Sequence, residues 1–370
     1  MTAGAPRPGY ELFLSTVFRP LIAGALGAGL ALGCSGGETR APAKTPTVLA
    51  SAAPSATAPA APPAPPPTSA PEDAAAPTEA DHLRALFAIP ADPAPEKITL
   101  NTHYVVSNED KQHVYHGAVA GRGGAYVGVG AEQSFLFAGW ARSEVMFLMD
   151  FDDWVVDINE IHGLAFEHAR TPDELVDLWK AEHAEQLAGW IKERWPDEAS
   201  RERRLKVFEH GRPKVELRLK LLRKWMAAHQ KPFFASDQAE FDHVARLWRE
   251  KRVRCVRGDL TASGALRAFG DLAKRAGWVV RVMYMSNAEL YFNYDQGTFR
   301  DNLRSLPFDE RSIIVHTHPA DNAQYHYIWQ EAPEYVRWIG RVQSFRDLLY
   351  EAKLPRQGKF ENGAWMIKPP

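Results

Sequence analysis

A tract dominated by alanine, proline, serine, threonine and glycine limits where this chain of 370 residues can fold. It runs from residue 35 to about residue 78 and includes the uncharged, proline-dense stretch at residues 60–67. Such a composition cannot bury enough apolar surface to offset the entropy lost on ordering, and its prolines favour an extended spacer. We therefore assign residues 34–78 to a disordered tether and residues 79–370 to a single globular α/β domain.

The segment before the tether has the pattern of an export signal. Residues 20–33 carry no charge, are rich in Leu, Ala and Gly, and follow Arg19. Because a bilayer-spanning helix needs roughly 20 apolar residues, the pattern predicts a signal peptide over residues 1–33. Its end, Leu-Ala-Leu-Gly-Cys at residues 30–34, resembles the lipobox of bacterial lipoproteins. That resemblance implies a lipidated Cys34; an ordinary secretory signal or an uncleaved anchor is the alternative.

These features predict a domain that a lipid anchors to a membrane outside the cytoplasm. By analogy with enteric sorting, Ser35 after the cysteine favours the periplasmic face of the outer membrane. If Cys34 is acylated, Cys255 is the remaining thiol, so no intrachain disulfide is expected. The formal net charge of −2 argues against a nucleic-acid partner.

Apolar segments of strand length alternate with helical segments through the domain. Buried strands are expected at residues 125–130, 144–150, 253–257, 278–285 and 312–316. Helices are expected at residues 81–87, 132–140 and 264–276, with Ser263 capping the last, and a helical insertion at about 155–250. Residues 102–106 alternate as a short strand would. The sequence therefore predicts an α/β fold with a Rossmann-like, mostly parallel sheet covered by helices on both faces.

Four of the expected strand ends carry residues suited to a ligand site. In an open α/β sheet, ligands bind beyond the carboxyl ends of the strands. Gly128 and Gly130 would let the backbone approach a ligand and leave amides free at the next helix start. Asp150 follows about 20 residues later, where an acid can bind ribose hydroxyls. A tight turn that binds no ligand is the alternative for the glycine pair.

Several motifs of the chain resemble an uncharacterised bacterial lipoprotein family. The first group, within residues 104–152, comprises Ser-Asn-Glu at 107–109, Tyr-Val-Gly-Val-Gly at 126–130 and Phe-Leu-Met-Asp at 147–150. The second, within residues 258–316, comprises Gly-Asp-Leu-Thr at 258–261, Met-Ser-Asn-Ala-Glu at 285–289 and Leu-Pro-Phe-Asp-Glu-Arg-Ser at 306–312. The family's fold resembles that of class I S-adenosylmethionine-dependent methyltransferases.

This resemblance implies roles for particular residues. Gly128 and Gly130 would form the first glycine-rich loop, and Asp150 would bind the ribose. Asp259 would flank the adenine, and Ser286 with Asn287 would lie near the transferred methyl group. The sequence departs from the methyltransferase pattern, since Val127 and Glu132 stand where an acid and a third glycine are usual. This leaves open whether the domain transfers a methyl group or only binds a ligand.

A second candidate site is the pair His316 and His318. Two residues apart at a strand end, they face the same side and could both reach one metal ion. A catalytic zinc needs three protein ligands and an open position, and His326 or Asp321 would complete the set. Glu289 would then be the general base. The alternative is that the histidines only bond their neighbours in the strand.

Three functions therefore remain open from the sequence. The first is a methyltransferase-like domain that binds a small, nucleoside-like ligand related to S-adenosylmethionine. The second is a zinc-binding protein or zinc hydrolase, and the third is a non-catalytic envelope module that binds a macromolecule. Convergence of the acidic strand ends on one crevice would favour the first, and a third metal ligand beside the histidines the second. Polar groups scattered without a pocket would favour the third.

Overall fold

The computed structural model describes residues 76–98, 101–320, 324–354 and 358–370. Of these, the residues within Pro77–Pro370 form one compact unit. The predicted signal peptide, Cys34, residues 35–75 of the predicted tether and Asp321 lie outside the described residues. Residues 76–78 are described, and the Thr78 side chain caps the helix that begins at Glu79, so the predicted tether extends slightly too far. Among the residues described, no helix is both long and apolar enough to cross a membrane.

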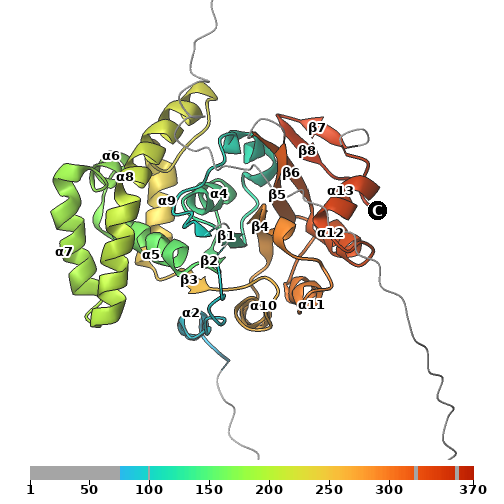
Figure 1. The fold of residues 1–370 in the computed structure, drawn as a ribbon, viewed down its shortest axis with the longest axis horizontal. Coiled ribbons are helices and arrows are strands. Elements are labelled where there is room, and N and C mark those ends of the chain that lie inside the picture. Colours follow the sequence, from blue (N-terminus) through green and yellow to red (C-terminus); the bar gives the residue numbers. More distant parts are fainter. Residues whose placement is uncertain (1–75, 99–100, 321–323, 355–357) are drawn as a thin grey trace, which may run out of the picture. The chain divides into compact units, whose positions relative to one another are not determined.

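The strands of the described residues form one sheet in the order β3-β2-β1-β4-β5-β6-β8-β7 (Figure 1). The strands are β1 (Ala125–Val129), β2 (Val145–Asp150), β3 (Val253–Arg257), β4 (Val280–Ser286), β5 (Ile313–Ala320), β6 (Gln324–Glu331), β7 (Lys359–Glu361) and β8 (Ala364–Met366). Only the β5–β6 and β7–β8 neighbours among these are antiparallel. The predicted α/β fold with a mostly parallel sheet is confirmed.

The strand order changes direction at β1. From β1 the chain adds β2 and β3 on one side, then returns to place β4 and β5 on the other. The carboxyl ends of these five parallel strands share one edge of the sheet, which we call the carboxyl edge. In open α/β sheets the crevice that binds ligands lies at such a switch point.

Both faces of the central strands are buried, which explains why these strands are continuously apolar. In β2, Met146 and Leu148 join one hydrophobic core, whereas Phe147 and Met149 join the other. Successive side chains of a strand point to opposite faces. A strand covered on both sides must therefore be apolar throughout, as the sequence pattern predicted.

Helices supply the other half of each core (Figure 1). Packed into the first core are η2 (Gln112–Tyr115), α3 (His116–Val119), α4 (Gln133–Ala141), α5 (Asp153–His168), α6 (Pro172–Asp177), α7 (Ala184–Arg194), α8 (Glu198–Ala228) and α9 (Gln238–Arg249). Packed into the second are α2 (Glu79–Phe87), α10 (Ala265–Ala276), η4 (Ala288–Tyr291), α11 (Phe299–Ser305), α12 (Ala332–Ile339) and α13 (Phe345–Glu351). One short element, η3 (Ala181–His183), precedes α7.

The predicted helical insertion is confirmed as the region from α5 to α9, between β2 and β3. Four of the described helices in this region begin at a capping side chain: Asp152 caps α5, Thr171 caps α6, Asp197 caps α8 and Asp237 caps α9. Each of these side chains accepts a hydrogen bond from a backbone N–H of the first turn. Such caps stabilise a helix by about 1 kcal/mol.

Two local predictions were wrong. Ser263 does not cap α10; the N-cap residue is Gly264, and the first N–H, of Ala265, donates to Asp92 Oδ1 at 3.0 Å. Because Asp92 is far from α10 in sequence, local pattern reasoning could not find it. Residues 102–106 alternate in polarity but join no strand. Instead, the His103 side chain of this segment contacts the Asp152 carboxylate beyond β2.

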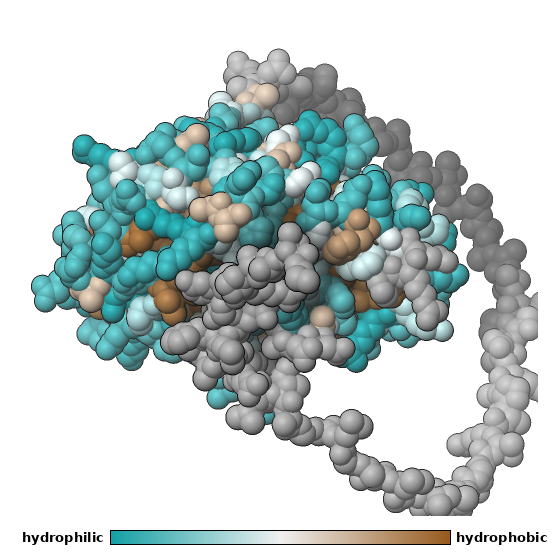
Figure 2. Space-filling model, turned by 90° about the horizontal axis from the view of Figure 1, so that it is seen from above, coloured by the Kyte–Doolittle hydropathy of each residue, from teal (hydrophilic) through white to brown (hydrophobic). Residues whose placement is uncertain are grey.

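One side of the domain is mostly polar where Figure 2 shows it. On the side seen in Figure 2, hydrophilic residues predominate and the hydrophobic ones form small patches. Small patches of this kind are normal on a protein surface.

Candidate functional site

The ends of β1 and β2 meet through a hydrogen bond between the two residues that the sequence predicted. The Gly130 N–H donates to Asp150 Oδ2 at 3.1 Å, and the Asp152 N–H donates to Asp150 Oδ1 at 3.0 Å. Gly130 has a φ of +84°, which favours glycine, and its carbonyl accepts from Asn159 Nδ2 at 2.8 Å. The glycine turn and the acid therefore form one unit at the carboxyl edge.

The environment of Asp150 favours its neutral form. Partial burial is the main cause that raises the pKa of this carboxyl, and the negative charge of Asp152 adds to the rise; the resulting pKa is about 7. The backbone N–H groups of Gly130, Phe151 and Asp152 lower the pKa, but they oppose this rise only in part. Asp150 can therefore change its protonation state near neutral pH.

Gly128 has a different role from the one expected of it. A Cβ atom at this position would lie 2.5 Å from the Tyr126 hydroxyl and 2.6 Å from its ring. The two residues share one face of β1, and Gly128 makes room for the buried Tyr126 side chain. The space beside Gly128 is thus filled by the chain itself rather than left for a ligand.

The end of β4 lies across the switch point from Asp150. Ser286 has a φ of +49°, a strained conformation for a residue with a side chain. Its hydroxyl donates to Glu109 Oε1 at 2.8 Å. Asn287 follows and is partly exposed, as Ser286 is. Backbone strain at a strand end of this kind is commonly found at functional sites.

Glu109 is a buried acid that the sequence reasoning did not select. Only 1 % of this residue is exposed, and its Oε1 accepts from Ser286 and, at 2.8 Å, from the Thr317 hydroxyl on β5. Burial raises the pKa of the Glu109 carboxyl. In the sequence, Glu109 stood out only as the third residue of the Ser-Asn-Glu motif. A local pattern does not indicate which acidic residue of a loop will be buried.

Residues 103–111 cross the carboxyl edge; we call them the crossing segment. His103 Nδ1 lies 2.8 Å from Asp152 Oδ2 beyond β2. The Ser107 N–H donates to Glu132 Oε2 at 3.0 Å beyond β1, and Glu109 reaches β4 and β5. Arg218 of α8 fixes Glu132 from the other side, with its Nε 2.8 Å from Oε1. The chain's own polar side chains therefore occupy part of the carboxyl edge at the switch point.

Asp259, the fourth predicted strand-end residue, shapes a loop. It is exposed, and its Oδ1 accepts from the Thr261 N–H at 2.7 Å and from the Thr261 hydroxyl at 2.8 Å. Its own N–H donates to Asp92 Oδ2 at 3.0 Å. The side chain thus stabilises the turn between β3 and α10.

The predicted histidine pair is divided between two environments. His316 is fully buried: its Nδ1 bonds to Glu289 Oε2, and its Nε2 accepts from Gln330 Nε2 at 3.0 Å. His318 is partly exposed and faces His326 across the β5–β6 pair, with ring centroids 6.5 Å apart. Because both ring nitrogens of His316 have protein partners, neither is free for a metal ion.

Glu289 is held as tightly as His316. Its Oε1 accepts from the Tyr294 hydroxyl at 2.6 Å and from the Tyr335 hydroxyl. No group of three or more His, Cys, Asp or Glu residues suited to a metal ion occurs in the part of the chain that the structure describes. The geometry therefore gives the zinc hypothesis no support.

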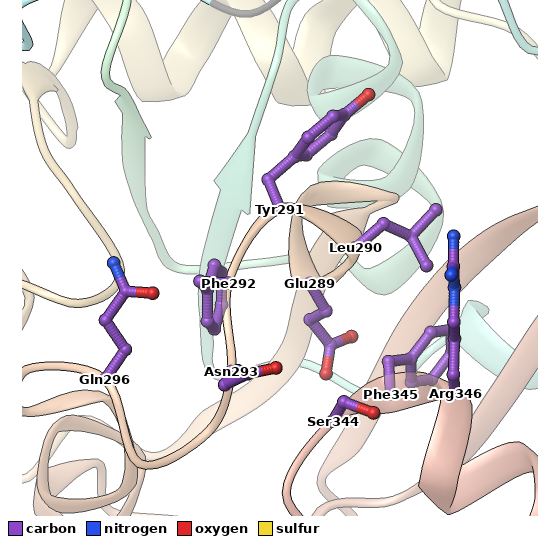
Figure 3. A pocket seen from close by; sticks show the side chains of 9 residues that line it. All are labelled: Glu289, Leu290, Tyr291, Phe292, Asn293, Gln296, Ser344, Phe345 and Arg346. Carbon is purple, nitrogen blue, oxygen red and sulfur yellow. The ribbon is translucent and has the colours of Figure 1, made fainter. Parts of the chain in front are cut away.

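A shallow pocket of about 420 Å³ opens beside Glu289 (Figure 3). It lies between the residues after β4 and the start of α13, and its lining comprises Glu289, Leu290, Tyr291, Phe292, Asn293, Gln296, Ser344, Phe345 and Arg346. Figure 3 shows Tyr291 pointing away from Glu289. Since Glu289 is only 1 % exposed and its carboxylate is bonded to three side chains, it forms part of the pocket wall rather than a free ligand group.

The sequence profile of one protein family, described as "Domain of unknown function (DUF7790)", matches residues 104–361. The chain belongs to this family. The match includes β1 to β7, most of the crossing segment and the ends of β1, β2 and β4. No curated protein was found to match the chain.

Proposed function

We propose that the domain is a Rossmann-like, methyltransferase-type module that binds a small, nucleoside-like ligand at the carboxyl edge. The observation that carries this proposal is the hydrogen bond of 3.1 Å between the Gly130 N–H and Asp150 at the switch point. In nucleotide-binding folds, the turn after the first strand and the acid after the second act together on one ligand. In this domain a hydrogen bond joins Gly130 to Asp150, and both residues are partly exposed.

The two sides of the switch point offer complementary groups to such a ligand. Asp150 can accept hydrogen bonds from the vicinal hydroxyls of a ribose. At the end of β4, the Asn287 amide can donate and accept hydrogen bonds, and the Glu109 carboxyl fixes the strained Ser286. A nucleoside carries both hydroxyl donors and polar ring atoms, so it fits this arrangement better than an apolar ligand does.

Binding is better supported than methyl transfer. Glu132, at the position of the third glycine in the methyltransferase pattern, is bonded to Arg218 and to the Ser107 N–H. Glu109 and its hydroxyl partners fill the neighbouring space. The side chains in these contacts occupy space that the second substrate of a transferase would need. Asp150, in contrast, stays partly exposed.

Calorimetric titration of the full chain with adenosine, S-adenosylmethionine and S-adenosylhomocysteine tests this proposal. At least one compound should bind, and Asp150→Ala should weaken it by roughly 10- to 100-fold, because hydrogen bonds to a carboxylate are lost. Asp271→Ala, at an exposed position of α10, is the control and should leave binding unchanged. Absence of binding for all three compounds, or binding that tolerates Asp150→Ala, would refute the proposal.

We also propose that a lipid on Cys34 anchors this domain outside the cytoplasm. The support is the uncharged run before Cys34 and the proline-rich tract after it. Metabolic labelling with a radioactive fatty acid in a bacterial host should label the protein, and Cys34→Ser should abolish the label. Cys255→Ser is the matched control, since Cys255 is a buried free thiol. Label that persists in Cys34→Ser would exclude this anchor.

A further inference from the structure

The first turn of α5 carries a tryptophan beside the proposed ribose-binding acid. Trp154 is partly exposed and follows Asp150 by four residues. The backbone N–H of Trp154 donates to Asp152 Oδ1 at 3.0 Å, and the backbone N–H of Asp152 donates to Asp150 Oδ1 at 3.0 Å. Two consecutive hydrogen bonds therefore fix the backbone that carries the indole relative to the acid.

One face of this indole is covered by an imidazole from elsewhere in the chain. The His103 and Trp154 rings are stacked, with centroids 4.0 Å apart and planes inclined by 7°. His103 lies at the start of the crossing segment, and its Nδ1 is held by Asp152 at 2.8 Å. Parallel contact at this separation is also how a nucleobase stacks on an aromatic side chain.

The remaining surroundings of the indole give the site an outer boundary. His210 of α8 contacts Trp154 edge-on, with centroids 5.3 Å apart and planes inclined by 78°. The His210 ring in turn contacts the Lys214 ammonium group. A ring that replaced His103 would thus lie flat on the indole, beside the Asp152 carboxylate that now binds His103. The Asp152 N–H in turn donates to Asp150, which connects this position to the acid.

We propose that Trp154 is the stacking platform for the planar base of a nucleoside, and that His103 occupies this platform when no ligand is bound. The inference rests on the proposed function and specifies the class of its ligand: a nucleoside whose ribose hydroxyls bind Asp150. Rotation of the His103 side chain uncovers the indole. Asp152 then still caps α5 through the Trp154 N–H, so the helix start is kept.

Titration of the full chain and its variants with adenosine tests the inference. His103→Ala removes the competing ring and should tighten adenosine binding by roughly 2- to 10-fold. Trp154→Leu should weaken it by roughly 10-fold or more, and Trp154→Phe, which keeps an aromatic ring, by less. Circular dichroism checks that each variant is folded.

Two controls separate stacking from other effects. His168→Ala removes a similar stack, on Trp190 with centroids 3.7 Å apart and planes inclined by 8°, and should not change adenosine binding. Methyl riboside has hydroxyls but no base, so its affinity should respond to Asp150→Ala and not to His103→Ala. Adenosine binding that needs Asp150 but tolerates Trp154→Leu and His103→Ala would overturn this inference and leave the proposed function standing. Absence of binding in every variant would overturn both.

A measurement without ligand tests the stack itself. In a nuclear magnetic resonance spectrum of the full chain with labelled histidine, ring protons of His103 over an indole should be shifted upfield. Trp154→Leu should remove that shift, and Trp190→Leu should remove only the shift of His168. If the His103 protons show no upfield shift in the wild-type protein, the imidazole does not occupy the platform and the inference fails.

Discussion

The raised pKa of Asp150 makes the stability of the domain depend on pH in a way that one substitution can isolate. A carboxyl whose pKa is higher in the folded than in the unfolded protein binds more protons when folded. Stability is therefore greatest below the unfolded pKa and falls as pH rises towards the folded one. For Asp150 these limits are 3.8 and about 7.

The size of the effect follows from the same two values. Each pKa unit corresponds to about 1.4 kcal/mol, so ionising Asp150 costs the folded state about 4 kcal/mol over this range. Asp150→Asn carries no charge at any pH in this range. Between about pH 4.5 and 6.5, its free energy of unfolding should rise relative to wild type by about 1.4 kcal/mol per pH unit.

Urea denaturation of both proteins at closely spaced pH values measures this difference. Hydrogen bonds altered by the substitution change the free energy of unfolding by the same amount at every pH. The slope of the difference against pH therefore reports the titration of Asp150. Asp271→Asn, at an exposed position of α10, is the matched control, and its profile should run parallel to that of wild type. If the Asp150→Asn profile also runs parallel to wild type, Asp150 is not titrating near neutral pH and the electrostatic argument is wrong.

Three further substitutions test contacts of the carboxyl edge by urea or thermal denaturation. Glu109→Ala should lower the free energy of unfolding by about 2–4 kcal/mol because the Ser286 and Thr317 hydroxyls lose their acceptor, and Glu109→Gln should lower it clearly less; equal losses would contradict this. Gly128→Ala should cost about 1–3 kcal/mol because its Cβ meets Tyr126, and a neutral result would show that the ring can move. His316→Ala should cost about 2–4 kcal/mol, whereas a chelator should leave the wild-type midpoint unchanged; a lower midpoint with chelator would restore the zinc hypothesis.

Most of the parallel sheet could be predicted because its strands are buried on both faces. Continuous apolar runs such as that of β2 have one simple explanation in a domain of this size. The β6, β7 and β8 strands were not predicted. In β6, polar residues such as Gln324 and His326 interrupt the apolar pattern, and β7 and β8 are three residues each. Their pairing depends on tertiary contacts rather than on a local signal.

The sequence could predict only those residues of the candidate site that directly follow a strand. Gly130 and Asp150 were brought together as expected, because the carboxyl ends of neighbouring parallel strands share one edge. The partners of Ser286 could not be predicted, since Glu109 reaches it from 177 residues away in sequence. Likewise, nothing local indicated that His103 would stack on Trp154.

The acids of the carboxyl edge differ in the partners that hold them, and this difference points to the residues that respond to a ligand. Glu132 is fixed by the guanidinium of Arg218, and Asp152 is held by His103 and by the start of α5. The side-chain hydrogen bonds of Asp150 and Glu109 come only from neutral donors: backbone N–H groups for the first, hydroxyls for the second. Neutral donors stabilise a buried carboxylate less than a cation does, which is why burial can raise the pKa of both. A ligand that supplies hydrogen-bond donors gains most at such carboxylates. Of the two, Asp150 is the more exposed, so we expect a nucleoside to bind at Asp150 rather than at Glu109.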